Sequence, residues 1–268
     1  VNNLNTARGA LAGAGATNTA ALAVGGSEPA ISAKTENWNG SNWTEVNDLN
    51  TGRRSTAGFG TQTAAIAAGG NDPYLAIVES FNGTSWTEVG DLNTGRASLK
   101  GVGTTPAGLV YGGFTPPQTG VTESWNGSSW TEVADLNTAR SALGGAGTQT
   151  AALAFNGGPQ ANVGSGSIYN TETWNESSWT EVNNTNTASE GAGSSGSNTS
   201  AITFGGSIYA SSGSNNRTEQ YNGTNWTEVA NLSTGRATGG SGSSESDNKS
   251  AIYYGGAETQ MRQKNLQV

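Results

Sequence analysis

Residues 122–133 read TESWNGSSWTEV, and four close copies of this stretch recur along the chain. The copies are TENWNGSNWTEV at 35–46, VESFNGTSWTEV at 78–89, TETWNESSWTEV at 171–182 and TEQYNGTNWTEV at 218–229. The final valine belongs to a longer series at one motif position, which includes both ends of the chain: Val1, Val46, Val89, Val133, Val182, Val229 and Val268. Self-similarity at this period is typical of propellers and repeat arrays.

Two further signals recur in a fixed order within each unit. An arginine follows the valine by seven residues in five units, at Arg8, Arg53, Arg96, Arg140 and Arg236. A Gly-Gly pair follows in all six units, from Gly25-Gly26 to Gly255-Gly256. The repeat therefore covers the whole chain, and we predict a single domain over 1–268 with units at approximately 1–46, 47–89, 90–133, 134–182, 183–229 and 230–268.

Each unit contains signals for four short strands. In the fourth unit we expect strands near 141–147, 151–155, 171–174 and 178–182, because apolar and polar residues alternate there between turn residues. Asn-Gly pairs such as Asn126-Gly127 predict a tight hairpin turn in which both residues have positive φ. Gly and Ala dominate the first strand, as crowding around a central axis requires. We predict an all-β, six-bladed β-propeller of four-stranded antiparallel blades.

The order of arginine, Gly-Gly, glutamate, an aromatic residue two positions later and tryptophan resembles the kelch repeat of β-propellers. The amino-acid sequence of the units, for example the WNGTSWTEV-like and LNTGR segments, is also similar to that of kelch-like repeat proteins of marine bacteriophages. The first resemblance implies a kelch-like propeller fold. The second implies a protein of the virion surface, or an extracellular one, that contacts other virion or scaffold proteins or a host surface glycan.

Composition excludes several function classes. The chain has no cysteine and no histidine, so it lacks the residues of thiolate zinc sites and the commonest general base and metal ligand, and we expect no cofactor and no metal. A net charge of −8 disfavours binding to nucleic acid, which requires a basic surface. No apolar run is long enough for a membrane span. The chain opens at Val1 without methionine, which fits either a processed start or a piece of a longer polypeptide.

The repeated aromatic and charged residues have structural interpretations. We expect the eight tryptophans to form the core between blades, including Trp43, Trp86, Trp130, Trp179 and Trp226; exposed sugar-stacking rings are the alternative. We interpret the repeated arginines and the glutamates Glu36, Glu79, Glu123, Glu172, Glu219 and Glu258 as Arg–carboxylate braces within or between blades. A catalytic pair of carboxylates, as in glycoside hydrolysis, should break the repeat symmetry, and these residues obey it. We therefore expect no enzyme activity.

Candidate binding residues lie where the units differ. The loops between the second and third strands vary most, and they should all emerge on one face of a propeller. They carry Tyr74, Phe114, Pro116, Pro117, Tyr169 and Tyr209. Lys100 is the only charge at its aligned position near the axis; it would either bind an anion in a central channel or reach solvent at the strand end, and we favour the second interpretation.

The last unit departs from the pattern, because Gln260 and Asn265 replace the aromatic residue and the tryptophan. We expect the weakest seam of the ring, or a neighbour, beside these residues. Unit five also departs, with Thr185 and Ser189 replacing the leucine and the arginine. The favoured function is a non-catalytic structural or adhesive module acting through its variable loops. A lectin-like, carbohydrate-binding propeller is the alternative, and a glycoside-acting enzyme is the least favoured.

Overall fold

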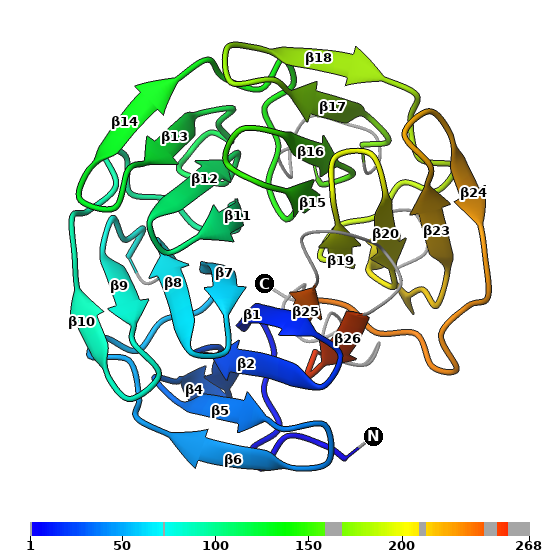
Figure 1. Ribbon diagram of the computed structural model, residues 1–268. Coiled ribbons are helices and arrows are strands. Elements are labelled where there is room, and N and C mark those ends of the chain that lie inside the picture. The colour runs from blue at the N-terminus through cyan, green and yellow to red at the C-terminus, as the bar shows by residue number, and fades with distance from the viewer. Residues whose placement is uncertain (1, 72, 159–167, 209–212, 244–250, 257–268) are drawn as a thin grey trace, which may run out of the picture.

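The computed structural model describes residues 2–71, 73–158, 168–208, 213–243 and 251–256. Five four-stranded antiparallel sheets stand as blades around a central axis, with the first strand of each innermost (Figure 1). Blade 1 contains β1 (Ala12–Thr17), β2 (Ala20–Val24), β5 (Thr35–Trp38) and β6 (Trp43–Val46); blade 2 contains β7 (Ala57–Thr61), β8 (Ala64–Ala68), β9 (Val78–Phe81) and β10 (Trp86–Glu88); blade 3 contains β11 (Lys100–Thr104), β12 (Ala107–Tyr111), β13 (Thr122–Trp125) and β14 (Trp130–Val133).

The remaining strands complete two blades and three hairpins. Blade 4 contains β15 (Gly144–Gly147), β16 (Ala152–Phe155), β17 (Thr171–Trp174) and β18 (Trp179–Val182); blade 5 contains β19 (Gly193–Gly196), β20 (Ala201–Phe204), β23 (Thr218–Tyr221) and β24 (Trp226–Glu228). The short hairpins are β3 (Ser27–Glu28) with β4 (Ala30–Ile31), β21 (Ser207–Ile208) with β22 (Gly213–Ser214), and β25 (Gly240–Ser243) with β26 (Ala251–Tyr254). The part of the chain that the structure describes contains no helix that could cross a membrane.

The prediction of six four-stranded blades is wrong, because the structure is a five-bladed propeller. The described residues of the last unit contribute two strands to the ring, β25 and β26, which form a two-stranded sheet between β19 of blade 5 and β1 of blade 1 (Figure 1). We call this pair the closing hairpin. The recurring valines count sequence units rather than strands. The last unit lacks the aromatic hairpin sequence that forms the two outer strands of every blade. Its predicted outer residues, Gln260 and Asn265 among them, lie outside the described residues.

The core lies between neighbouring blades. One apolar cluster joins Phe59 and Ile66 of blade 2 to Val110, Trp125 and Trp130 of blade 3. Similar clusters lie between blades 1 and 2, blades 3 and 4, blades 4 and 5, and the closing hairpin and blade 1. The residues of the inner strands must have small side chains because the blades meet there. A Cβ on Gly101, for example, would lie 2.5 Å from Cδ1 of Phe59. Burial of both faces explains why second strands such as Ala107–Tyr111 show no polar alternation.

Backbone hydrogen bonds close the ring in two complete circles. In the first circle the residue two positions before each innermost strand donates its N–H to the carbonyl of its counterpart in the preceding unit, at 2.7 to 2.8 Å: Ala10, Ser55, Ser98, Ala142, Gly191 and Thr238. All six have φ between 51° and 63°. In the second circle the second glycine of each pair, or Gly157 in blade 4, donates its N–H to the backbone carbonyl of the residue at the arginine position of the next unit. The last of these bonds runs from Gly256 to Arg8 and closes the circle. The closing hairpin therefore takes a full place in both circles.

The outer hairpins differ in detail from the predicted two-residue turn. Trp38 pairs with Trp43, so the loop between them has four residues, and the amide N–H groups of Ser41 and Asn42 donate to the Asn39 side chain. Only the glycine has positive φ, 91° at Gly40. The asparagine side chain thus accepts the backbone N–H groups of its own loop, which in a two-residue turn would instead pair with the carbonyls of the opposite strand. In blade 4, Glu176 occupies the glycine position with φ of 76°.

Replacing this glutamate should stabilise the protein. Glu176→Gly removes an unfavourable left-handed conformation, and we expect the free energy of unfolding to rise by about 0.5–1 kcal/mol. The reverse change in blade 3, Gly127→Ala, where φ is 92°, should lower it by a similar amount. Urea denaturation followed by tryptophan fluorescence measures both variants. A stability change of the same sign in the two variants would contradict the interpretation.

Candidate functional site

Each buried glutamate of the repeat accepts two backbone N–H groups from the segment that leads into its blade. In blade 3 the Arg96 guanidinium lies 2.5 Å from Glu123 Oε1, and both side chains are inaccessible to solvent. The other carboxylate oxygen accepts the backbone N–H of Asn93 at 2.7 Å and its side-chain Nδ2 at 2.8 Å. The N–H of Thr94 donates to Oε1 at 3.4 Å. The chain leading into the blade is thereby tied to the third strand of the same blade.

The other blades repeat this arrangement with one informative exception. Arg8 pairs with Glu36, Arg53 with Glu79 and Arg140 with Glu172. Burial lowers the pKa of Arg53 and Arg140, an effect that the neighbouring glutamates oppose. In blade 5, where Ser189 replaces the arginine, Glu219 is still buried and accepts bonds from Asn186 and Thr187. The asparagine of the LNT segment is thus part of every one of these carboxylate sites, a role that its recurrence in the sequence could have indicated.

All eight tryptophans are buried, with exposed fractions of 1% to 6%. Their rings contact aromatic residues of their own and neighbouring blades, as in the edge contact of Trp179 with Tyr111 at 4.9 Å. Sugar stacking requires exposed tryptophan rings, but here neighbouring blades cover all eight rings. This removes the feature on which a lectin-like interpretation of the tryptophans depends.

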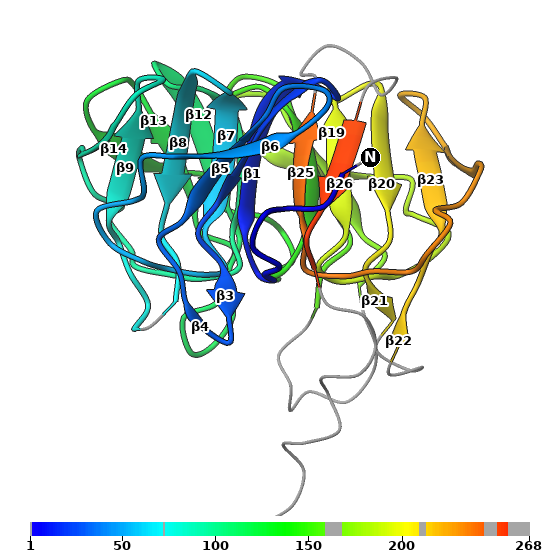
Figure 2. The same ribbon diagram turned by 90° about the horizontal axis from the view of Figure 1, so that it is seen from below.

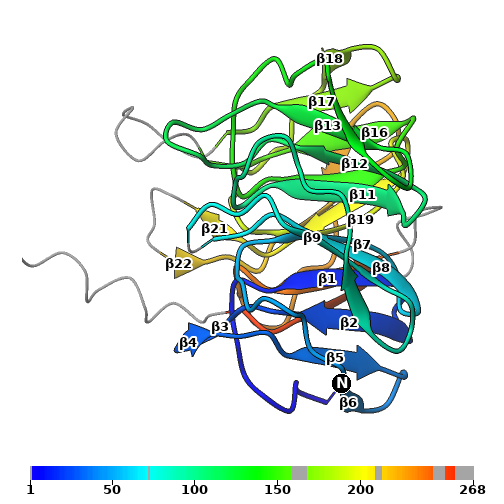
Figure 3. The same cartoon turned by 90° about the vertical axis from the view of Figure 1, so that its left-hand side faces the viewer.

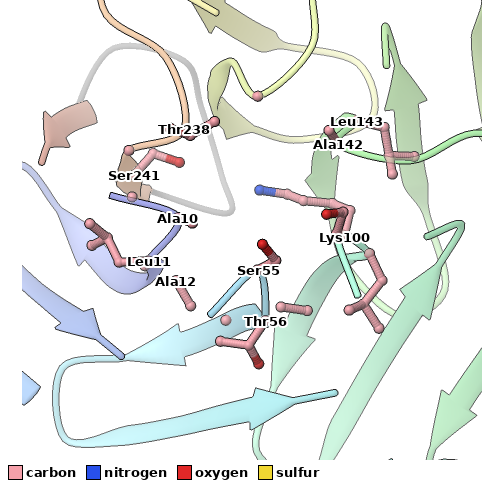
Figure 4. Close-up of a pocket in the computed structure, with 18 of the residues that line it drawn as sticks. Ala10, Leu11, Ala12, Ser55, Thr56, Lys100, Ala142, Leu143, Thr238 and Ser241 are labelled. Carbon is pink, nitrogen blue, oxygen red and sulfur yellow. The ribbon is translucent and has the colours of Figure 1, made fainter. Parts of the chain in front are cut away.

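The central channel contains a cavity of about 130 Å³ at the end where the first circle of hydrogen bonds lies. Small side chains and backbone line it, including Ser55, Ser98 and Ser241 (Figure 4). Among the described residues that line it, Lys100 is the only charged one, and its side chain points into the cavity rather than to the outside (Figure 4). This direction is the one that the first interpretation of Lys100, anion binding in the channel, requires, whereas the favoured interpretation places the side chain in solvent at the strand end. Lys100 also lines a smaller cavity deeper in the channel.

Burial lowers the pKa of Lys100 to about 8. No ion pair or hydrogen bond of its ammonium group with a described residue compensates for the lost hydration. An uncompensated cation at the end of a narrow cavity favours any anionic group that can enter it. The chemistry available here is the binding of a carboxylate, a phosphate or a sulfate group.

Lys100 should make stability depend on pH. Its pKa is about 8 in the folded state against 10.5 for the free side chain, so the unfolded state binds more protons between these values and stability rises with pH. Relative to Lys100→Met, we expect the native protein to gain about 2 kcal/mol between roughly pH 7.5 and 9.5. Denaturation with urea at each pH measures this difference. Lys34→Met, which removes a half-exposed lysine paired with Glu28, is the control and should leave the pH dependence unchanged.

The variable loops project from the face on which this channel cavity opens. The hairpins β3–β4 and β21–β22 extend from this face of the ring, which we call the loop face (Figures 2 and 3). Tyr74 and Phe114, from adjacent blades, form an edge contact with ring centroids 5.5 Å apart. Pro116 and Pro117 are exposed in the same loop as Phe114, and their peptide bond is cis. Tyr169 is 50% exposed, whereas Tyr209 lies outside the described residues.

Of the predicted binding residues, the structure brings together Tyr74 and Phe114, and it places Tyr169 in a separate loop of blade 4. Lys100 lies apart from them, inside the channel. Sequence reasoning missed the circle of backbone groups around the cavity, because alanine, serine and threonine at these positions carry no visible signal for positive φ.

This fold defines the protein as a β-propeller with repeated four-stranded blades. No family model matches the sequence, and no curated protein matches it. Among solved structures the chain is similar to the one described as "Structure of YjhT", with a TM-score of 0.78, 14% sequence identity, and coverage of 96% of this chain and 93% of that chain. At this level of identity the similarity shows the fold alone.

Proposed function

We propose that the protein is a non-catalytic, kelch-like adhesive or structural module that binds its partner through the loop face. The observation that carries the proposal is the contrast between the repeated blades, which we call the frame, and the variable loops between second and third strands. The frame repeats the same Arg–Glu contacts and buried tryptophans from blade to blade, while loops of different length and sequence share one face. A rigid scaffold that carries variable loops is a common basis of recognition surfaces.

The loop face offers two kinds of contact. Tyr74 and Tyr169 expose 36% and 50% of their surface, and large amphipathic rings of this kind are enriched at binding sites. Lys100 lies at the centre of the same face, inside the channel cavity, where it can receive an anionic group of the partner. The two features together favour a partner that covers the channel mouth.

We further propose that this partner is a virion or scaffold protein, or a host surface glycan, and that the module acts on a bacteriophage particle. The resemblance of the repeats to kelch-like phage proteins supports this setting. The repeated carboxylates are engaged by backbone, asparagine and arginine donors in separate blades, which supports a non-catalytic role. A catalytic pair would instead require two carboxylates held at a defined separation in one site.

Oriented immobilisation tests the proposal directly. Because the chain has no cysteine, Ser128→Cys and Ala134→Cys each introduce a single attachment point, on the turn between β13 and β14 and just after β14 respectively. The first leaves the loop face outward, and the second turns it toward the support. Intact bacterial cells and an array of bacterial surface polysaccharides serve as probes. We expect binding through the first variant and its loss through the second.

Loop-face variants then separate contact residues from the frame. Tyr169→Ala should weaken binding in the productive orientation, whereas Thr131→Ala, on the exposed outer strand β14, should not. Equal capture in both orientations would refute the loop-face assignment. Capture of polysaccharides alone would assign the lectin-like alternative, and turnover of a captured glycan would refute the non-catalytic assignment.

A further inference from the structure

The outer edge of β26 has no strand beside it among the described residues. The second strand of each of the five blades pairs with a third strand, as β12 pairs with β13 through Val110 and Glu123. In contrast, within the described ranges β26 pairs only with β25. A cavity of about 330 Å³ lies along this edge, and Trp43, Arg236 and Tyr253 are among the residues that line it.

Arg236, which lines this cavity, belongs to a segment that resembles the carboxylate-binding segments of the blades. The segment Leu232–Arg236 reads LSTGR and aligns with the LNTGR segment before blade 3. The two segments hold the same backbone position, because Leu232 donates to Asn216 as Leu92 does to Ala76, and the Arg236 carbonyl accepts from Gly206 as that of Arg96 does from Gly70. The two backbone N–H donors and the arginine that hold Glu123 in blade 3 therefore recur here, whereas Ser233 replaces the asparagine whose side chain also donates to that glutamate.

These donors are the N–H groups of Ser233 and Thr234 and the guanidinium of Arg236. None has an acceptor in the parts of the chain that the structure describes, whereas Asn93, Thr94 and Arg96 all bind Glu123. Arg236 is only partly buried, unlike the four paired arginines. The site thus has the positive charge and the amide donors of a carboxylate site without its carboxylate.

Among the described residues, two more groups at this edge lack a partner that counterparts in other seams have, although the indole N–H of Trp226, between two complete blades, also has none. Gly112 donates its N–H to Val121, the residue before the third strand, at 3.1 Å, but no described residue accepts from Gly255. Trp179 donates its indole N–H to Thr122, the first residue of the third strand of blade 3, at 3.2 Å. Trp43 packs against Tyr254 as Trp179 does against Tyr111, yet its indole N–H has no such acceptor within the described ranges.

We propose that the open edge of β26 binds an extended strand of the form Thr-Glu-x-aromatic from another polypeptide. The carbonyl before the threonine would accept from Gly255, and the threonine hydroxyl would accept from Trp43. The glutamate would enter the site formed by Ser233, Thr234 and Arg236. Four strands of this chain have this form, TENW, TESW, TETW and TEQY, so the specificity of the edge can be read from the blades themselves.

The spacing of the sequence argues against Glu258 as the occupant. In blades 1 to 3 the glutamate follows the second glycine of the pair by nine or ten residues, as Glu36 follows Gly26, but Glu258 follows Gly256 by two. Gly256 is held by Arg8 in the same way as Gly113 is held by Arg140, so the chain leaves the closing hairpin from the usual position. Glu258 itself lies outside the described residues.

A synthetic peptide tests the proposal with the full chain. The fluorescein-labelled probe TGVTESWNGSSWTEV copies residues 119–133. We expect saturable binding, measured by fluorescence anisotropy, and a higher melting temperature with the peptide present. Replacing the first glutamate of the peptide by glutamine should weaken binding roughly tenfold or more, because the bond that is lost involves a charged group. Arg236→Gln in the protein should have the same effect.

Controls and contrary outcomes are equally defined. Arg217→Gln removes an exposed arginine that does not line the cavity and should leave binding unchanged, and Arg236→Lys should recover part of it. No binding by the native chain would overturn the proposal. Binding only after removal of residues 257–268 would also overturn it, since the chain's own end would then cover the edge. Self-association that Arg236→Gln abolishes would assign the edge to a second copy instead. The inference is independent of the loop-face function.

Discussion

Glu123→Gln is expected to lower the free energy of unfolding by about 3–5 kcal/mol. The substitution keeps the shape of the side chain but leaves the buried Arg96 guanidinium without a counterion. It also turns an amide group toward the N–H donors of Asn93 and Thr94. Urea denaturation followed by tryptophan fluorescence measures the loss, since the tryptophans are packed between blades.

Glu132→Gln is the matched control for this substitution. Glu132 lies directly opposite Glu123 in the β13–β14 pair but is exposed on the outer strand. The same chemical change there should alter stability by less than about 0.5 kcal/mol. Similar losses in the two variants would contradict a specific role of the buried ion pair, as would a loss below about 1 kcal/mol in Glu123→Gln.

Trp179→Ala should lower the free energy of unfolding by about 3–5 kcal/mol. Trp179 belongs to the outer strand of blade 4, and its ring fills the seam against Tyr111 of blade 3. The substitution creates a cavity in the apolar cluster between blades 3 and 4, and it removes the hydrogen bond to Thr122. Denaturation midpoints in urea, compared with those of the native chain, measure the effect.

Trp179→Phe separates packing from hydrogen bonding at the same position. It keeps most of the ring but not the indole N–H, so we expect a smaller loss of about 1–2 kcal/mol. A sugar-stacking tryptophan would behave differently, because its removal would abolish glycan binding at nearly unchanged stability. That result would restore the lectin-like interpretation.

Much of the frame could be predicted from the sequence because repetition amplifies weak signals. A single Glu-x-aromatic pattern means little, but its recurrence in every blade, with the glycine signal in all five and the arginine in four, defines strand order and direction. The positions of Arg96, Glu123 and Trp179 followed from this pattern. The Asn93 donor was visible in the same pattern, but asparagine in a loop is so common that its recurrence did not point to a role.

The number of blades and the orientation of Lys100 could not be predicted in the same way. The number of blades depends on the last unit, and the orientation of Lys100 depends on a position that differs between units. At such positions the other units do not indicate what the structure will be. The closing hairpin keeps the glycines and apolar residues of the inner strands, which resemble a complete unit until the outer strands are sought. The Lys100 side chain turns inward because the neighbouring residues of the channel are small, a property of all the units together rather than of its own strand.

The first circle of hydrogen bonds joins neighbouring units through main-chain atoms alone. Its six members are two alanines, two serines, a glycine and a threonine, yet the six bonds differ in length by only 0.1 Å, from 2.7 to 2.8 Å. The geometry of this joint is therefore the same whichever side chains the two neighbouring units carry at this position. Duplication, exchange or reordering of units by recombination would therefore preserve the joint without compensating mutations, so the gene can change its loops one whole unit at a time.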